Sequence, residues 1–334
     1  MRIVIAHSRL QGFGGGERTV LELLRGLGRR HEVEMWAGHY APERTYPGLR
    51  DFPRREVADW QWPLLRSDAD ALIAHSFGAR LLALRSPRVV SYLHTLRARY
   101  LRPGLRPDLR LRRRLDRTAM RRSAAILTNS TYTARRIARE YGRAAEVAPP
   151  GVDERLFALP ECAGDYMLSV GRLAPEKGIE RLLAWTAPLA LDLVIVGTGQ
   201  LDYERRLRRL AGPRVRFRGA LTGEALEAAY AGCRFLAFTP HDEELGMAAL
   251  EAMAAGKPVI ATPEGGLSEL VREGATGFFA TDAAQFAEAA GRLMASDQVS
   301  RQLGREGRRL ARAYSWERLV LRVEEICEQL SHTP

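Results

Sequence analysis

Short apolar runs that favour β-strands alternate with helical patterns in the first half of this 334-residue chain. A crossover between parallel strands is long enough to hold a helix, so this alternation predicts a parallel sheet with helices on both faces. The strand candidates are Ile3–Ala6, Glu32–Ala37, Ala71–His75, Val89–His94, Ala124–Thr128 and Glu146–Ala148.

The alternation is interrupted at Pro149-Pro150-Gly151, which predicts a linker at about 149–164. A second strand and helix series follows, and the last pattern, from Trp316 to about Leu330, predicts a helix. We expect an α/β protein with two doubly wound Rossmann-like domains that face each other across a cleft, at 1–150 and 151–314, and a C-terminal helix at 315–334 that packs back toward the first domain. The second series of strands is Tyr166–Val170, Leu191–Val196, Val215–Phe217, Phe235–Phe238 and Pro258–Ala261.

Composition excludes several classes of protein. Hydrophobic residues make up 46% and charged residues 27%, which is typical of a globular chain and not of a disordered one. No run approaches the roughly 18 apolar residues of a membrane-spanning helix, and the first apolar run is too short for a signal peptide, so we expect a cytoplasmic protein. The widely spaced Cys162, Cys233 and Cys327 predict reduced thiols and neither a zinc site nor a disulfide framework.

A glycine-rich segment, Gly12-Phe13-Gly14-Gly15-Gly16-Glu17, lies between the first predicted strand and helix. Glycine allows a ligand to approach the backbone, and a helix N-terminus favours an anion. The dinucleotide fingerprint GxGxxG requires glycine where Glu17 or Thr19 stands, which argues against NAD. The alternative is a tight turn with close helix packing.

The segment Gly171-Arg172-Leu173-Ala174-Pro175-Glu176-Lys177-Gly178 follows the first strand of the second series. Arg172 can bind a phosphate with two donors and Lys177 as a point charge, so the pair could hold a diphosphate. The alternative is two surface cations near a helix start. That position is unfavourable for cations without an anion, because the helix dipole is positive there.

A third motif combines an acidic loop with a helix predicted from about Gly246 to Ala254. Glu243 precedes this helix and Glu251 lies within it, so the two could hold hydroxyls of one extended ligand. The free amides of Gly246, Met247 and Ala248 would face phosphates of the same ligand. The alternative is that Glu243 and Glu244 only complement the helix dipole.

In this order and spacing, the three motifs resemble glycosyltransferase family 4, retaining enzymes of the GT-B architecture. The most specific element is Glu243-x7-Glu251 followed by Ala252-Met-Ala-Ala-Gly-Lys-Pro-Val-Ile-Ala261. The resemblance covers nearly the whole chain and is weaker before residue 120. Supporting segments are Gly15-Gly16-Glu17-Arg18, Pro150-Gly151-Val152-Asp153, Gly171–Gly178, Glu264–Leu270 and Gly274–Phe278.

The resemblance implies definite roles. Arg172 and Lys177 would neutralise the diphosphate of a nucleotide-sugar donor, and Glu251 would bind the ribose hydroxyls. Glu243 would contact the transferred sugar near the reacting carbon. Gly246 and Met247 would offer backbone amides, and Gly15 and Gly16 would let the first domain close over the diphosphate. The family implies no cofactor besides the donor substrate and no metal.

Histidine and carboxylate candidates also lie in the first domain. His94 ends a predicted strand and would contact the donor sugar, as a histidine so placed often does in this family, while His7 and His75 are weaker candidates. The stretch 92–101 is similar to a pattern of a mannosyltransferase-like subgroup. Asp68-Ala69-Asp70 matches the DxD metal motif of the other main glycosyltransferase fold, but it precedes an ordinary buried strand.

The net charge of +11 is concentrated in one segment, because residues 97–122 contain 11 arginines and only two acids. A helix is predicted at about 108–122, with an apolar stripe of Leu111, Leu115 and Ala119. Beside it lies a basic stripe that would bind an anionic membrane surface or an anionic acceptor, or would simply be solvated. Nucleic acid is disfavoured, because few stacking aromatics accompany the charge. The basic stripe is Arg110, Arg113, Arg114, Arg117 and Arg121.

The resemblance therefore implies a metal-independent, retaining hexosyltransferase that uses GDP-mannose or a UDP-sugar. Its acceptor would be a carbohydrate or a lipid-linked glycan, and its location cytoplasmic with peripheral membrane contact. Two alternatives are a sugar-nucleotide epimerase of the same fold and a non-catalytic basic protein that binds membrane or nucleic acid.

Overall fold

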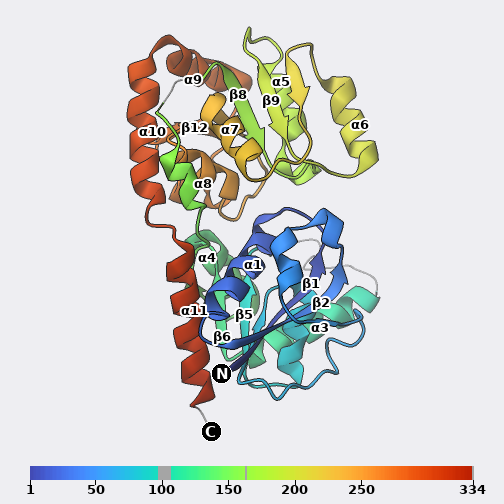
Figure 1. Ribbon diagram of the computed structural model, residues 1–334. Helices are drawn as coiled ribbons and strands as arrows, with labels where there is room; N and C mark the ends of the chain where they lie inside the picture. The colour runs from blue at the N-terminus through green and yellow to red at the C-terminus, as the bar shows by residue number, and fades with distance from the viewer. Residues whose placement is uncertain (97–106, 162–163, 333–334) are drawn as a thin grey trace. The chain divides into compact units, whose positions relative to one another are not determined.

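The computed structural model describes residues 1–96, 107–161 and 164–332, and the chain divides into two compact units. Unit 1 comprises Met1–Gly151 together with Trp316–Pro334, and unit 2 comprises Val152–Ser315. Each unit contains one parallel sheet with helices around it (Figure 1). This arrangement confirms the predicted fold class of two doubly wound Rossmann-like sheets.

Unit 1 is built on a seven-stranded sheet with the order β3-β2-β1-β4-β5-β6-β7, and all of its paired strands are parallel. The strand order reverses between β1 and β4, so the loops after these two strands diverge to opposite faces of the sheet. The strands are β1 Arg2–Leu10, β2 Glu32–Tyr40, β3 Arg54–Glu56, β4 Ala71–Ala74, β5 Val89–Leu93, β6 Ala125–Thr128 and β7 Glu146–Val147.

Alternating side chains of β1 supply the cores on the two faces of this sheet. Ile3 and Ile5 pack in one cluster with α1 and α11, whereas Val4 and Ala6 pack in another on the opposite face. A strand that is apolar at every position is therefore covered on both faces. The helices of unit 1 are α1 Gly15–Leu27, α2 Phe77–Arg80, α3 Pro107–Arg122, α4 Thr131–Tyr141 and α11 Trp316–Ser331.

The C-terminal helix α11 lies against α1, and both belong to unit 1 (Figure 1). Val320 and Val323 are buried in this contact, and a Cβ at Gly26 would collide with Val320. The buried Glu324 of α11 is paired with two groups that follow α1. His31 Nε2 lies 2.6 Å from one carboxylate oxygen and Arg30 Nη2 lies 2.7 Å from the other.

Unit 2 is built on a six-stranded parallel sheet with the order β10-β9-β8-β11-β12-β13, and its order reverses between β8 and β11. Leu236 and Phe238 of β11 face one core, and Phe235 and Ala237 face the other. The strands are β8 Tyr166–Val170, β9 Leu193–Val196, β10 Val215–Phe217, β11 Cys233–Phe238, β12 Val259–Ala261 and β13 Gly277–Phe279. The helices are α5 Ile179–Thr186, α6 Leu201–Leu210, α7 Glu224–Gly232, α8 Met247–Ala254, α9 Ala283–Ala295 and α10 Asp297–Ala311.

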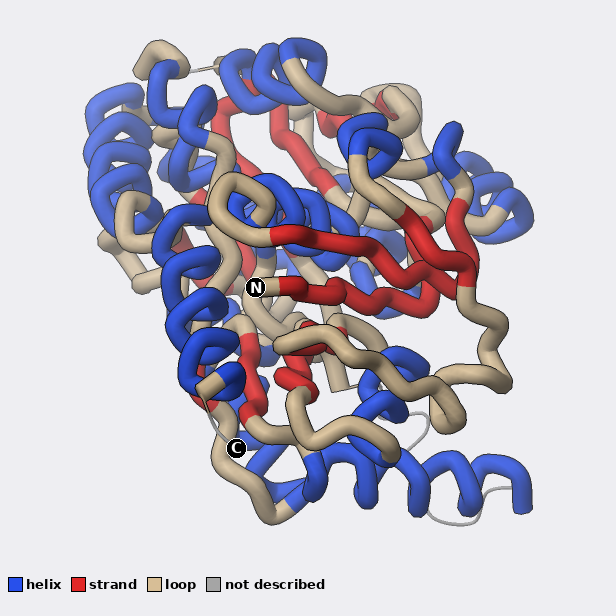
Figure 2. Tube along the Cα trace, turned by 60° about the horizontal axis from the view of Figure 1, so that its bottom comes forward, coloured by secondary structure: helices blue, strands red, loops and turns tan. Residues whose placement is uncertain are grey.

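Helices and strands alternate with loops along the Cα trace (Figure 2). The local predictions were wrong at a few elements. The strands β3 and β13 were not predicted, because each has three residues and no run of alternating apolar side chains. The segment after β12 was predicted to be helical, but only a short 3-10 helix, Gly265–Glu269, stands there. Within the described residues, none of the helices combines the length and apolar character needed to cross a membrane.

Candidate active site

The loops after β8 and β11 meet at the carboxyl edge of the unit 2 sheet, where the strand order reverses. Open α/β sheets bind ligands at this position. Gly178 ends the first loop with a φ of 65°, and a Cβ there would collide with the carbonyl oxygen of Thr239. The backbone N–H of His241 donates to the carbonyl oxygen of Glu176 at 2.8 Å. Glycine at 178 therefore lets the two loops pack directly against each other.

Two of the predicted site residues are brought together by this packing. Lys177 Nζ lies 2.6 Å from Glu243 Oε2, and both side chains are mostly buried. The preceding Asp242 has a φ of 55°, and it is the one residue other than glycine with a positive φ in the described part of the chain. Strained backbone of this kind is typical of functional sites, because the surrounding structure must hold it in place.

Arg172 lies on the same loop, with its side chain more exposed than that of Lys177. It makes an ion pair of 3.3 Å with Glu176, four residues further on. An exposed ion pair of this kind contributes little to stability, so Arg172 can exchange Glu176 for a phosphate at low cost.

The loop after β12 contacts the backbone of Glu243 and holds it in place. The N–H of Gly266 donates to the carbonyl oxygen of Glu243 at 2.7 Å, and Gly265, with a φ of 76°, leaves no room for a Cβ beside Glu243. Arg181 of α5 bonds Glu264 at 2.6 Å and the carbonyl oxygens of Thr239 and Pro240. Sequence reasoning did not identify Arg181, because nothing local distinguishes it from the other arginines of the chain.

The helix α8 begins beside this loop. Gly246 is its N-cap, with a φ of 95° and no capping side chain, so the amides of the first turn, including that of Met247, need an external acceptor. Glu251 lies one turn further along the helix, and its carboxylate accepts a hydrogen bond of 2.7 Å from the hydroxyl of Tyr230. The completely buried Tyr230 on α7 holds Glu251 in place and was also missed by sequence reasoning.

In unit 1 the predicted residues lie at the corresponding edge of the other sheet. Gly15 and Gly16 are the first two residues of α1, which follows β1, and Gly14 is its N-cap without a capping side chain. A Cβ at Gly16 would lie 3.9 Å from Nε2 of His7. The helix start and His7 therefore occupy the carboxyl end of β1, next to the point at which the strand order reverses.

Three histidines cluster at this edge: His7 lies within the last part of β1, and His75 and His94 directly follow β4 and β5. The Nε2 atoms of His75 and His94 are in contact, and the ring centroid of His75 lies 5.5 Å from that of His7. Burial lowers the pKa of His94 to about 3 and that of His7 to about 4, and it lowers the pKa of His75 well below its ordinary value. The histidines are neutral at neutral pH and can donate or accept a hydrogen bond there.

The DxD pair has a structural role at the opposite edge of the same sheet. Asp70 accepts a hydrogen bond of 2.8 Å from the backbone N–H of Arg2, and Asp68 makes an ion pair of 2.7 Å with the guanidinium of Arg2. These contacts join the start of β1 to the segment before β4.

The arginine-rich helix α3 departs from the predicted pattern of stripes. Leu111 is 59% exposed, and the buried positions are Asp116, Ala119 and Met120. The apolar stripe was thus wrong at Leu111. Of the predicted basic stripe, Arg113 and Arg117 both bond Glu140 of α4, whereas Arg110, Arg114 and Arg121 are exposed, with no carboxylate partner in the part of the chain that the structure describes. Residues 97–101 of the predicted subgroup pattern lie outside the described residues.

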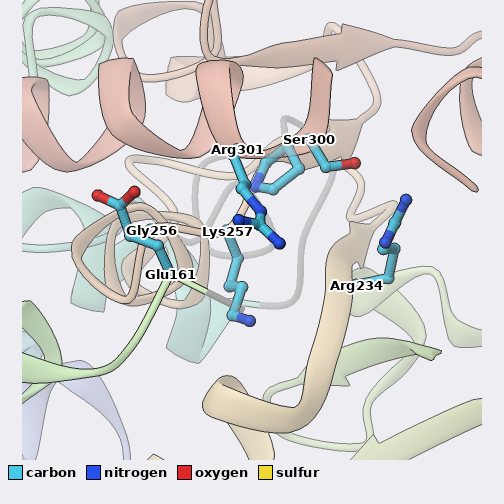
Figure 3. A pocket seen from close by; sticks show the side chains of 7 residues that line it. Glu161, Arg234, Gly256, Lys257, Ser300 and Arg301 are labelled. Carbon is cyan, nitrogen blue, oxygen red and sulfur yellow. The ribbon is translucent and has the colours of Figure 1, made fainter. Parts of the chain in front are cut away.

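A small basic pocket in unit 2 lies at the amino ends of β11 and β12 (Figure 3). Its cations already have protein partners. Arg234 lies 2.5 Å from Asp297, Arg301 lies 3.7 Å from the same residue, and Lys257 donates to the carbonyl oxygen of Ala231 at 2.7 Å. We therefore assign these cations a structural role.

Both units match models of known protein families. The family described as Glycosyltransferase Family 4 matches residues 13–156, and the one described as Glycosyl transferases group 1 matches residues 164–296. The chain is a member of glycosyltransferase family 4. The matched regions contain His94, the loop from Arg172 to Lys177 and both glutamates of the third motif.

Curated relatives of this family 4 protein include a D-inositol 3-phosphate glycosyltransferase of Geodermatophilus obscurus. It is 31% identical over 65% of the chain and 55% of the relative. A GDP-mannose-dependent alpha-mannosyltransferase of Mycolicibacterium smegmatis is 36% identical over 50% of the chain and 44% of the relative. The chain spans about half the length of the curated relatives that it matches.

Among solved structures, HepE of Anabaena in complex with UDP and glucose superposes with a TM-score of 0.79 at 20% identity. The match covers 99% of this chain and 100% of that one. At this level of identity the likeness establishes the fold, which is that of the GT-B glycosyltransferases.

Proposed function

We propose that this family 4 protein transfers a hexose from a nucleotide-diphosphate sugar to an acceptor hydroxyl, with retention of anomeric configuration. The observation that carries this proposal is the Lys177–Glu243 pair at the strand-order reversal of unit 2, beside the uncapped first turn of α8. A cation, a carboxylate and free amides at one sheet edge match the charges of a diphosphate joined to a sugar. Names of the relatives support GDP-mannose or a UDP-sugar as the donor, since HepE was solved with UDP and one relative depends on GDP-mannose.

Each residue then has one part of the donor to bind. Arg172, Lys177 and the amides of Gly246 and Met247 neutralise the diphosphate. Glu251, oriented by Tyr230, accepts hydrogen bonds from the ribose hydroxyls. Glu243 binds hydroxyls of the transferred sugar, and His94 binds the sugar from unit 1, where Gly15 and Gly16 supply the start of α1.

In the proposed reaction, negative charge develops on the departing phosphate. The bond from the anomeric carbon to the phosphate oxygen breaks, and the acceptor oxygen forms its bond on the same face of the sugar. The acceptor proton passes to the departing phosphate. Stabilisation of this phosphate by cations and amides is the main contribution of the protein to catalysis, and no metal is required.

The acceptor is a carbohydrate or a lipid-linked glycan, and the exposed arginines of α3 provide peripheral contact with an anionic membrane surface. At about 1 kcal/mol per basic residue near such a surface, Arg110, Arg114 and Arg121 supply reversible binding. The protein would then work at the cytoplasmic face of the membrane.

Thermal unfolding with a panel of nucleotides and nucleotide sugars, in the presence of EDTA, tests the donor site. A ligand at one hundred times its Kd stabilises the protein by about 2.7 kcal/mol, which is readily measured. We expect a shift with one diphosphate nucleotide that is lost in Arg172→Ala and kept in the surface control Arg205→Ala. Absence of any shift, or the same shift in both variants, would contradict the donor site.

Product analysis separates the possible activities. Incubation with the stabilising nucleotide sugar and a panel of glycan acceptors should give a glycosylated product with the anomeric configuration of the donor. An isomerised nucleotide sugar without acceptor would indicate an epimerase instead. Binding to anionic vesicles with no nucleotide binding would indicate a non-catalytic protein.

A further inference from the structure

The contact between His75 and His94 defines which ring nitrogen of His94 carries its proton. His75 is 3% exposed, and its ring stacks on that of Tyr92 with centroids 5.1 Å apart and planes 5° from parallel. This stacking holds the His75 ring in one orientation, with Nε2 against Nε2 of His94. His94 is only partly buried, and the contact at Nε2 leaves Nδ1 as the nitrogen without a histidine partner.

Two neutral imidazoles whose Nε2 atoms touch must share a single proton between those atoms, because two N–H groups would repel each other and two lone pairs would form no bond. Burial keeps both rings neutral. Either His75 donates to His94, or His94 donates to His75. The two arrangements differ in where the remaining protons lie.

The surroundings of His75 Nδ1 decide between them. This atom is buried, and in the described part of the chain it makes no hydrogen bond of ordinary geometry, since the backbone of His75 itself interacts only weakly with the ring. If His94 donated, the proton of His75 would sit on Nδ1 as a buried N–H without an acceptor, and orphaned donors of this kind are rare in proteins. If His75 donates, Nδ1 carries only a lone pair, and a buried acceptor left without a donor is less unusual.

The other groups around His75 do not change this assignment. His7 already accepts a hydrogen bond at Nδ1 from the backbone N–H of Arg9, at 3.1 Å. The hydroxyl of Tyr92 donates to the carbonyl oxygen of Ala148, at 2.6 Å. Neither group supplies a partner for Nδ1 of His75.

We propose that His75 is a positioning residue whose Nε2–H donates to Nε2 of His94 and holds His94 as the Nδ1–H tautomer. His94 therefore presents a neutral N–H donor, and not a base, to an oxygen of the substrate. The kind of substrate oxygen, a sugar hydroxyl or a phosphate oxygen, rests on the proposed function, whereas the tautomer does not.

Histidine side-chain ¹⁵N NMR of the full-length protein, with no substrate added, tests the tautomer directly. The signals of His94 are assigned by their loss in His94→Asn. We expect the Nδ1–H form in the wild type and in His75→Gln, whose amide can still donate. We expect the Nε2–H form in His75→Phe, which keeps an aromatic ring against Tyr92 but has no donor.

An Nε2–H tautomer of His94 in the wild type would overturn the proposal, even if the variants do not fold. An unchanged tautomer in folded His75→Phe would do the same. The exposed His39, replaced in His39→Phe, is the matched control and should leave the His94 signals unchanged.

Activity gives a second and separate measurement. With a donor and acceptor identified, His75→Phe should lower kcat about tenfold or more with little change in KM for the donor, and His75→Gln should recover most of it. Equal losses in both variants would contradict a donor role for His75. If the wild type shows no transfer at all, the proposed function fails, while the NMR result still decides the tautomer.

Discussion

Lys177 Nζ lies 2.6 Å from Glu243 Oε2, so the cation assigned to the diphosphate and the carboxylate assigned to the sugar are directly paired. The two residues are 66 positions apart and belong to loops that follow adjacent strands. Their pairing fixes the position of the carboxylate, which is what a group that binds sugar hydroxyls near a reacting carbon requires.

Glu243→Gln should abolish measurable transfer, with kcat/KM lowered by at least about a hundredfold. The amide carries no charge to pair with Lys177, and it offers one acceptor oxygen to the sugar hydroxyls in place of two. Radiolabelled transfer assays measure this loss. Stabilisation by the nucleotide alone should persist, and Glu244→Gln is the neighbouring control. Full transfer by Glu243→Gln would refute the assignment of Glu243.

Tyr230→Phe should weaken donor binding about tenfold, because it removes the 2.7 Å hydrogen bond that orients Glu251. If Glu251 binds the ribose, the variant should also lose preference for the ribonucleotide over its 2′-deoxy analogue. Calorimetric titration with both nucleotides measures this preference. Tyr203→Phe is the control, and an unchanged preference in Tyr230→Phe would place the ribose elsewhere.

The two groups of arginines on α3 should differ in membrane binding. Replacement of Arg110, Arg114 and Arg121 by glutamine should nearly abolish sedimentation with anionic vesicles at low salt. Replacement of Arg113 and Arg117, which Glu140 already neutralises in part, should have a smaller effect per residue. Equal effects per residue would contradict a distinct role for Arg110, Arg114 and Arg121, and no binding by the wild type would leave α3 as a solvated helix.

Glu324→Gln should destabilise unit 1 by about 1–3 kcal/mol, because it removes the buried carboxylate that pairs with Arg30 and His31 between α1 and α11. Urea unfolding followed by fluorescence measures the change. Glu317→Gln, on the same helix, is the control and should change stability little. A loss of under 1 kcal/mol in Glu324→Gln would mean that the ion pair does not anchor α11.

Acid should destabilise the protein through His7. Burial lowers the pKa of His7 from 6.5 to about 4. Between pH 6.5 and about pH 4, the His7 side chain therefore binds more protons in the unfolded chain than in the folded protein. The contribution of neutral His7 to stability is present above pH 6.5 and is lost as the pH falls toward about 4, by up to about 1.4 kcal/mol per pH unit. Urea unfolding at a series of pH values should show a shallower loss in His7→Asn than in the wild type or in His39→Asn. Parallel curves for His7→Asn and the wild type would contradict this.

The placement of the second and third motifs could be predicted from the sequence, because its signals are local. Lys177 and Glu243 do lie in segments that follow strands, as the apolar runs before them predicted. The supporting residues Tyr230 and Arg181 could not be predicted, since each acts through a partner that only the folded sheet brings near. The exposure of Leu111 was missed because helical periodicity does not show which face of α3 packs on its neighbours.

The sequence by itself determined the order of strands and helices, the doubly wound class of both sheets and the family, because periodicity and motif spacing are properties of short segments. Only the tertiary structure decided which loops became neighbours. Strand order reverses between β1 and β4 and between β8 and β11, and these reversals placed His7 near His75 and Lys177 against Glu243. Pairing between distant strands depends on the packing of both faces of a sheet at once, and no short segment of the chain contains that information.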